Sequence, residues 1–155
     1  MNIKHIFFDL DHTLWDFETN SNKTFSYIFE RNKLQINFDA FIEVYQPINF
    51  RYWKLFREDK VNKADLRYGR LREAFDAIGY EVNDEMIHLL SEEYITFLAD
   101  HNALFDNALD ILDYLKPQYN MHIITNGFEE VQIRKLRNSN LSPFFDQVIS
   151  DGENG

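Results

Sequence analysis

The stretch IKHIFFDLDHTLW, residues 3–15, decides the fold and opens with an apolar run. The apolar residues ahead of the acids are Ile3, Ile6, Phe7 and Phe8. They predict a short strand that is apolar on both faces, and such a strand belongs inside a parallel sheet covered by helices. Asp9 stands at the carboxyl end of this strand. Because open α/β sheets bind ligands at that end, Asp9 and Asp11 are expected to face a crevice.

Two carboxylates two residues apart can divide the chemistry of a hydrolysis. In this interpretation Asp9 is a nucleophile and metal ligand, while Asp11, one step along the turn, donates and accepts protons. In the structural alternative, Asp11 and Asp16 are ordinary capping residues where the strand passes into its loop. An Asp-x-Asp pattern alone is common by chance, so the choice depends on a second motif.

That second motif is MHIITNG, residues 121–127, a short apolar strand that ends in Thr125, Asn126 and Gly127. A hydroxyl at a strand terminus, followed by a small residue and a helical segment, offers one side-chain donor and several backbone N–H groups to a phosphate. Thr125 could instead cap the helix. Because the motif follows Asp9 by about 115 residues with a helical stretch between them, the pair favours the functional interpretation.

Residues 16–102 show helical periodicity interrupted by short breaks, which predicts a bundle of four to five helices. Apolar residues recur at helical spacing, as at Phe25 and Phe29, and Pro47 is expected to separate a helix at 38–45 from the aromatic stretch that follows. The chain has 15 Phe, and most of its aromatic rings are predicted to fill the core of this bundle.

Several side chains near or within this region could reach a ligand. Trp15 and Phe17, beside the first motif, could stack on a nucleobase, with core packing as the alternative. The arginines of the helical region, Arg67, Arg70 and Arg72, are expected on solvated helix faces.

From Phe105 onward, helix and strand alternate again. Asp106 is expected to cap a helix that Pro117 follows as a stop signal. The strand ending at Thr125 comes next, then another helix, and a third strand is predicted at 144–149.

Composition limits the partners and the kind of site. The chain has no Cys, a net charge of −10 and no 18-residue apolar run, which excludes a disulfide scaffold and disfavours a membrane span and nucleic acid polymers. No signal peptide is recognisable, so a cytoplasmic enzyme is expected. A small phosphorylated metabolite remains possible as its partner, because one metal ion and a few local donors can overcome the global negative charge. The five His show no metal-ligand spacing, whereas two Asp suit Mg²⁺.

The pattern Asp9-x-Asp11-x-Thr13 resembles the first motif of the haloacid dehalogenase-like superfamily, and the strand ending at Thr125 resembles the second. The resemblance covers essentially the whole chain. It implies an α/β fold: a Rossmann-like three-layer parallel sheet, incomplete here, with an inserted all-helical cap that opens for substrate and closes for chemistry. The expected core is residues 1–15 and 103–155, and the expected cap is residues 16–102.

The stretches HTLWDFETNS, ITNGF and KLRNSNLSPFFD further resemble helical-capped phosphatases that act on nucleoside monophosphates, including house-cleaning pyrimidine 5′-nucleotidases. The implied reaction is two-step hydrolysis of a phosphomonoester. Asp9 attacks phosphorus to form an aspartyl phosphate, and Asp11 protonates the leaving oxygen and then activates water. Mg²⁺ would bind the Asp9 carboxylate and the Asp11 backbone carbonyl. The groups expected to hold the phosphoryl oxygens are the Thr125 hydroxyl and the amides of Leu10, Asp11, Asn126 and Gly127.

The superfamily pattern continues after the third strand with a Lys and later with paired acids that complete the Mg²⁺ site, and these motifs are not found in the 155 residues. Lys135 lies within the helix after Thr125 and is expected on a solvated face. Without a fourth strand, the first strand would keep an unpaired apolar edge. We therefore expect the chain to be the front two thirds of a longer one, inactive by itself, unless a partner segment supplies the rest.

Three other functions stay open at this point. A noncatalytic or partner-completed binding module would keep the fold without the later motifs. A phosphomutase would keep both acids. A dehalogenase would need Asp9 but no acid at position 11, because a halide leaves without a proton, so Asp11 favours phosphate chemistry.

Overall fold

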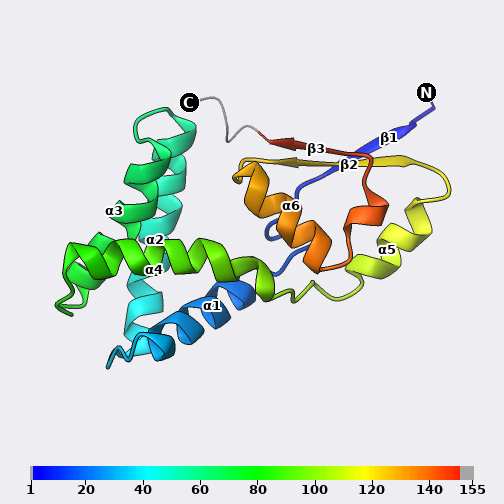
Figure 1. The fold of residues 1–155 in the computed structure, drawn as a ribbon. Coiled ribbons are helices and arrows are strands. Elements are labelled where there is room, and N and C mark those ends of the chain that lie inside the picture. Colours follow the sequence, from blue (N-terminus) through cyan, green and yellow to red (C-terminus); the bar gives the residue numbers. More distant parts are fainter. Residues whose placement is uncertain (1, 151–155) are drawn as a thin grey trace. The chain divides into compact units, whose positions relative to one another are not determined.

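The computed structural model describes residues 2–150. The chain divides into two compact units, one made of residues 1–21 and 98–155 and the other of residues 22–97 (Figure 1). The last part of the predicted core, residues 151–155, lies outside the described residues. The first unit combines both ends of the sequence, and the second unit is a single inserted segment.

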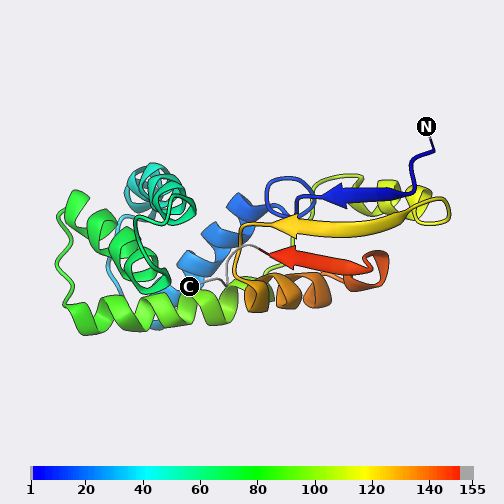
Figure 2. The same cartoon turned by 90° about the horizontal axis from the view of Figure 1, so that it is seen from above.

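The first unit contains a parallel three-stranded sheet in the order β1-β2-β3. Its strands are β1 (His5–Phe8), β2 (Asn120–Thr125) and β3 (Gln147–Ser150). Figure 2 shows the three arrows side by side and pointing the same way. Phe8 of β1 stands opposite Ile123 of β2. The predicted α/β fold, a Rossmann-like parallel sheet with an inserted helical segment, is confirmed.

Helices cover one face of this sheet. In Figure 1, α5 (Ala108–Leu115) and α6 (Glu129–Asn138) lie on the same side of the strands, and two 3₁₀ turns, η1 (Leu98–Asp100) and η2 (Ser142–Phe144), complete the unit. The other face exposes Phe7, Ile124 and Ile149, which are 54%, 51% and 42% exposed. The prediction that the first strand is buried on both faces is therefore wrong for residues 2–150, in which two of the three expected layers are present.

The second unit is built of helices. They are α1 (Phe17–Arg31), which begins in the first unit, α2 (Phe38–Arg57), α3 (Lys63–Ala77) and α4 (Asp84–Phe97). A capping box starts α3, since the Asn62 side chain accepts from the Asp65 amide while the Asp65 carboxylate accepts from the Asn62 amide. Within residues 2–150, no helix is both long and apolar enough to cross a membrane.

Pro47 lies inside α2, so the prediction that it separates two helices is wrong. A proline inside a helix removes one backbone hydrogen bond and costs about 3 kcal/mol. Packing on both sides of it offsets this cost. Before Pro47, Phe41 and Tyr45 are buried, and after it Tyr52 packs on α3. A Cβ at Gly69 would collide with the Tyr52 hydroxyl, so the glycine allows this close approach.

Two further local predictions are wrong. Asn107, not Asp106, precedes α5, and its backbone is left-handed with φ 67° and no side-chain cap bond. Arg70 is 3% exposed rather than solvated, because its Nη1 donates to Asn49 Oδ1 at 3.0 Å and its guanidinium lies over the Tyr94 ring. Arg67 and Arg72 are half-buried.

Two segments that lead into and out of the inserted helices are joined within the first unit. Asn20 Nδ2 donates to the Ala103 carbonyl at 2.9 Å, and the Ala103 amide donates back to Asn20 Oδ1 at 2.8 Å. The Asp16 amide also donates to the Ala103 carbonyl at 3.0 Å. Asn20 is fully buried, so these hydrogen bonds are shielded from water.

The core of the second unit is aromatic. Phe25 is fully buried, and its ring packs against four others at centroid distances of 4.6–5.6 Å: Phe29, Phe41, Tyr45 and Tyr94. Aromatic pairs at these distances add to the free energy gained by burial. The prediction that Phe residues fill the core of the helical segment is confirmed here.

Replacing Phe25 with Ala is expected to lower the free energy of unfolding by about 3–5 kcal/mol, because it removes the central ring and leaves a cavity. The matched control is Phe50→Ala, since Phe50 is 70% exposed on α2 and should change stability by less than about 0.5 kcal/mol. Urea unfolding followed by circular dichroism measures both. Equal losses in the two variants would contradict the assignment of Phe25 to the core.

Candidate active site

The two sequence motifs meet at one edge of the sheet. β1 and β2 run parallel, and Phe8 is opposite Ile123. Asp9 directly follows the end of β1, and Thr125 is the last residue of β2, so both lie at the carboxyl ends of neighbouring strands. Carboxyl ends of parallel strands are where open α/β sheets bind ligands. The strand register therefore brings the two motifs to the same edge of the sheet.

Asp9 is solvent-accessible, as an attacking carboxylate has to be. Its Oδ1 accepts from the Leu10 amide at 2.8 Å. Desolvation by its surroundings raises the pKa of the Asp9 carboxyl, the Leu10 hydrogen bond opposes this shift, and the charge of Asp11 adds to it. The net pKa of Asp9 is raised, so its surroundings disfavour the ionised form to some extent, and a nearby positive charge would favour it.

A tight turn after β1 fixes the direction of Asp11. The carbonyl of fully buried Leu10 accepts from three successive amides, those of Thr13, Leu14 and Trp15, at 3.3, 3.0 and 3.0 Å. His12 adopts a left-handed backbone with φ 64°, which is uncommon for a residue other than glycine. The turn therefore holds the backbone on both sides of Asp11.

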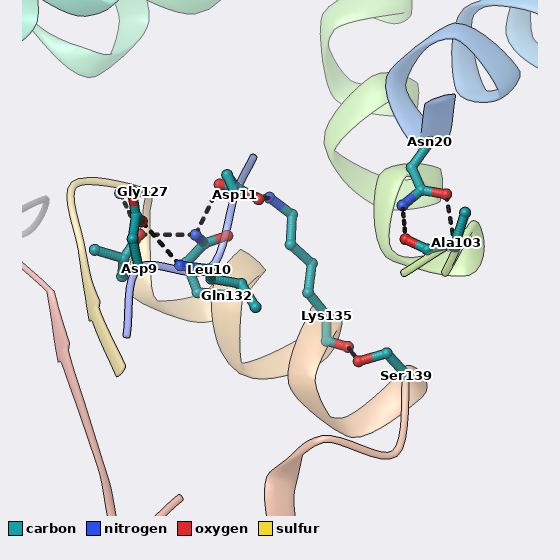
Figure 3. A network of polar contacts seen from close by, with 10 residues as sticks. Asp9, Leu10, Asp11, Asn20, Ala103, Gly127, Gln132, Lys135 and Ser139 are labelled. Atoms are coloured by element: carbon teal, nitrogen blue, oxygen red, sulfur yellow. Dashed lines mark hydrogen bonds and ion pairs between the residues drawn. The ribbon is translucent and has the colours of Figure 1, made fainter. Parts of the chain in front are cut away.

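The Asp11 carboxylate is held by two side chains of α6 (Figure 3). Lys135 Nζ donates to Oδ1 and Oδ2 at 2.9 and 3.2 Å. Gln132 Nε2 donates to Oδ2 at 3.0 Å. Lys135 is only 2% exposed, so the prediction that it lies on a solvated helix face is wrong. Its ammonium turns inward because Asp11 offers a charged partner there.

Aromatic rings complete the surroundings of Lys135. Its Nζ lies 4.4 Å from the centroid of the Trp15 ring and 5.2 Å from that of Phe17. Trp15 is fully buried, so in this structure its ring packs on the lysine and is not accessible for stacking on a nucleobase. Both rings follow Asp11 closely in sequence, so the same segment supplies the acid and the aromatic contacts of Lys135.

Thr125 is arranged to donate its hydroxyl proton. Its Oγ1 accepts from the Gly127 amide at 3.1 Å and from Gln132 Nε2 at 2.8 Å. A hydroxyl has two acceptor lone pairs and one proton, so both lone pairs are in use. The proton remains for an acceptor that residues 2–150 do not supply. This is the arrangement expected of a group that binds an anion's oxygen.

The remaining predicted phosphate-binding groups lie around the same strand ends. Asn126 is exposed. The amides of Leu10 and Gly127 donate to Asp9 and Thr125 in this structure, so a phosphoryl group would have to compete for them. Their role in binding phosphate stays a prediction.

Sequence reasoning missed Gln132 and misplaced Lys135. The available signal was their spacing: residues three apart on a helix share a face, and this helix follows the second motif directly. Spacing alone could not identify Asp11 as their common partner, because Gln132 and Lys135 lie 121 and 124 positions away from it.

Oxygen donors at this site fit Mg²⁺ better than a transition metal. Among residues 2–150, no group of three or more His, Cys, Asp or Glu could hold a metal ion. Mg²⁺ is commonly held by one or two carboxylates with water and substrate phosphate completing its shell. The accessible Asp9 carboxylate and the backbone carbonyl of Asp11 are oxygen donors of the kind that such a Mg²⁺ site uses. The Asp11 carboxylate is bound to Lys135 and Gln132 instead.

Three curated relatives share most of this chain. A Bacillus subtilis protein named as a HAD-hydrolase, YfnB, is 29% identical over 97% of this chain and 62% of its own length. The pyrimidine 5′-nucleotidase PynA of Streptococcus pneumoniae is 30% identical, with shares of 96% and 62%. The pyrimidine 5′-nucleotidase YjjG of Escherichia coli is 24% identical, with shares of 97% and 63%. The chain therefore spans less than two thirds of the length of these relatives.

Solved structures agree on the fold. The magnesium-bound crystal structure of YfnB from Bacillus subtilis superposes with a TM-score of 0.85 at 29% identity, covering 97% of this chain and 66% of that one. The L-2-haloacid dehalogenase of Xanthobacter autotrophicus has a TM-score of 0.68 at 19% identity, with shares of 96% and 56%, which shows a common fold alone.

A family model described as haloacid dehalogenase-like hydrolase matches residues 3–155, which include both strand-end motifs and the inserted helices. The chain belongs to the haloacid dehalogenase-like hydrolase family.

Proposed function

We propose that the whole protein is a Mg²⁺-dependent phosphomonoester hydrolase that works through an aspartyl phosphate on Asp9. The observation that carries this proposal is the Thr125 hydroxyl, whose two lone pairs are occupied and whose proton is left for an anion at the strand end next to Asp9. The pyrimidine 5′-nucleotidases among the relatives favour nucleoside 5′-monophosphates as substrates.

The residues divide the reaction as follows. Asp9 attacks phosphorus, and Asp11 protonates the leaving oxygen and later takes a proton from the water that attacks the phosphoenzyme. The Thr125 hydroxyl donates to a phosphoryl oxygen, together with the amides of Asn126 and Gly127. The amides of Leu10 and Asp11 are further candidates for the same task.

Mg²⁺, held by the Asp9 carboxylate and the Asp11 backbone carbonyl, would supply positive charge that favours ionised Asp9 and offsets the charge of the phosphoryl group. The raised pKa of Asp9 fits this role, since desolvation and the charge of Asp11 both disfavour its ionised form. The magnesium-bound relative supports the choice of metal.

We also propose that the chain is divided into a cap and a core. Residues 16–102 form the cap, and residues 1–15 with 103–155 form the core, to which a further segment of a longer chain adds the remaining site groups. The relatives' greater length supports this further segment. Residues 1–155 alone are proposed to be inactive.

The acid at position 11 separates this function from dehalogenation. Asp11 receives hydrogen bonds from both Gln132 and Lys135, so the structure holds a carboxylate that a departing halide would not require. The dehalogenases among the solved structures share the fold at 15–19% identity and do not bear on the substrate.

Asp9→Asn is expected to reduce Mg²⁺-dependent release of phosphate from p-nitrophenyl phosphate by roughly 10³-fold or more in the protein expressed from its complete gene, because it removes the nucleophile. The matched control is Asp113→Asn, an exposed acid of α5 that should leave the rate unchanged. Chelation by EDTA should abolish the wild-type rate, and added Mg²⁺ should restore it. No turnover by the complete wild-type protein would contradict the hydrolase and favour a binding module.

Thr125→Val should lower kcat/KM by about 10²-fold, since it removes one donor to a charged phosphoryl oxygen while nearly keeping the side-chain volume. Thr125→Ser keeps the hydroxyl and should retain most of the activity. Steady-state kinetics on a nucleoside monophosphate measure both, with thermal unfolding to confirm folding. Equal activity of the Val and Ser variants would show that the hydroxyl does not bind substrate.

A further inference from the structure

We propose that Gln132 and Lys135 are positioning residues that hold the Asp11 carboxyl group so that it takes up a proton from solvent and delivers that proton to the leaving oxygen. The inference rests on the proposed function, because it assigns a task to side chains around the same site. Gln132 and Lys135 lie on one face of α6, three residues apart, and both point to Asp11 (Figure 3).

Gln132 links the acid to the phosphate-binding hydroxyl. A single amide nitrogen, Nε2, donates to Asp11 Oδ2 at 3.0 Å and to Thr125 Oγ1 at 2.8 Å. An amide nitrogen carries two protons, so these two bonds use it fully. Gln132 is 1% exposed, and the bonds therefore persist without competition from bulk water. The amide fixes where Asp11 lies relative to the phosphoryl group that Thr125 would bind.

The backbone of the second motif makes room for this link. A Cβ at Gly127 would lie 2.7 Å from the Gln132 side-chain amide, which is closer than real carbon contacts allow. The absence of a side chain at Gly127 therefore lets Gln132 reach past the strand end to Asp11 and Thr125.

Lys135 fixes the carboxylate against rotation. Its ammonium contacts both oxygens of Asp11, and charge-assisted bonds of this kind are about twice as strong as neutral ones. The rings of Trp15 and Phe17 lie over the ammonium at 4.4 and 5.2 Å and restrict its own movement. A carboxylate on an exposed turn would otherwise sample several rotamers, only some of which reach the leaving oxygen.

Stability alone gives a weak reason for a lysine at this place. Taking a charge out of water is costly, and replacing a buried ion pair by apolar side chains is often neutral or stabilising. The Lys135 side chain is 3% exposed, whereas that of Asp11 is 22% exposed and open toward the strand end. This difference in exposure between the two side chains fits a buried Lys135 that orients an accessible Asp11.

The test compares two phosphate esters with leaving groups of different basicity. A nucleoside 5′-monophosphate releases an alkoxide-like oxygen that needs a proton, whereas p-nitrophenyl phosphate releases a weakly basic phenolate that needs little help. The measured quantity is kcat/KM for each ester, because kcat/KM reports the steps up to formation of the phosphoenzyme. The variants are Lys135→Met, Lys135→Arg and Gln132→Met in the protein expressed from its complete gene. Arg137→Met, an exposed basic residue of the same helix, is the matched control.

Misplacing an acid by about 1 Å can cost roughly 10²-fold in rate. Lys135→Met is therefore expected to lower kcat/KM for the nucleotide by about 10²-fold and that for p-nitrophenyl phosphate by less than about 5-fold. Lys135→Arg should recover most of the loss, because its guanidinium can also contact both carboxylate oxygens. Gln132→Met should impair both esters, since it also releases Thr125, but the nucleotide more.

Equal losses for the two esters in both Met variants would overturn the inference and reduce both residues to a structural role. If Lys135→Met does not fold, as thermal unfolding would show, the comparison of Gln132→Met with Arg137→Met decides in the same way. If the wild-type protein hydrolyses both esters and the variants keep the wild-type ratio of the two kcat/KM values, the inference is refuted but the proposed function is not. A wild-type protein that hydrolyses neither ester refutes the proposed function itself.

Discussion

The candidate site depends on the parallel pairing of β1 with β2. These strands are separated by more than one hundred residues, yet their register places Phe8 opposite Ile123 and so brings Asp9 and Thr125 to the same edge. Parallel strands need a long crossover, which gives the chain room for an inserted helical segment. Two hydrogen bonds between Asn20 and Ala103 join the two sides of that insertion.

Local sequence signals predicted the elements of this arrangement. The apolar runs before Asp9 and Thr125 were sufficient to place two parallel strands, and helical periodicity placed the inserted bundle between them. The same signals failed where packing outweighs propensity. Pro47 is tolerated because the aromatic rings on both sides of it are buried or packed against α3.

The rest of the site could not be predicted, because it consists of contacts between distant residues. A lysine in a helix with acidic and basic neighbours has the pattern of a solvated face, and only the folded chain shows that Asp11 is its partner. Exposure of Phe7 has a similar cause: an apolar run predicts burial, but which face is covered depends on helices elsewhere in the sequence. Hydrophobic periodicity and composition predict that a segment forms a helix or a strand, but not which other residues it contacts.

The two acids at the site have different electrostatic surroundings. The Asp11 carboxylate is bound to Lys135 and Gln132, so its charge is balanced by groups that lie in the core of the first unit. Asp9 receives one amide bond, and desolvation together with the charge of Asp11 raises its pKa. A phosphoryl group would add further negative charge beside Asp9. A cation that balanced that charge would come in addition to Lys135, whose ammonium already contacts Asp11, and for this reason we propose Mg²⁺ at Asp9.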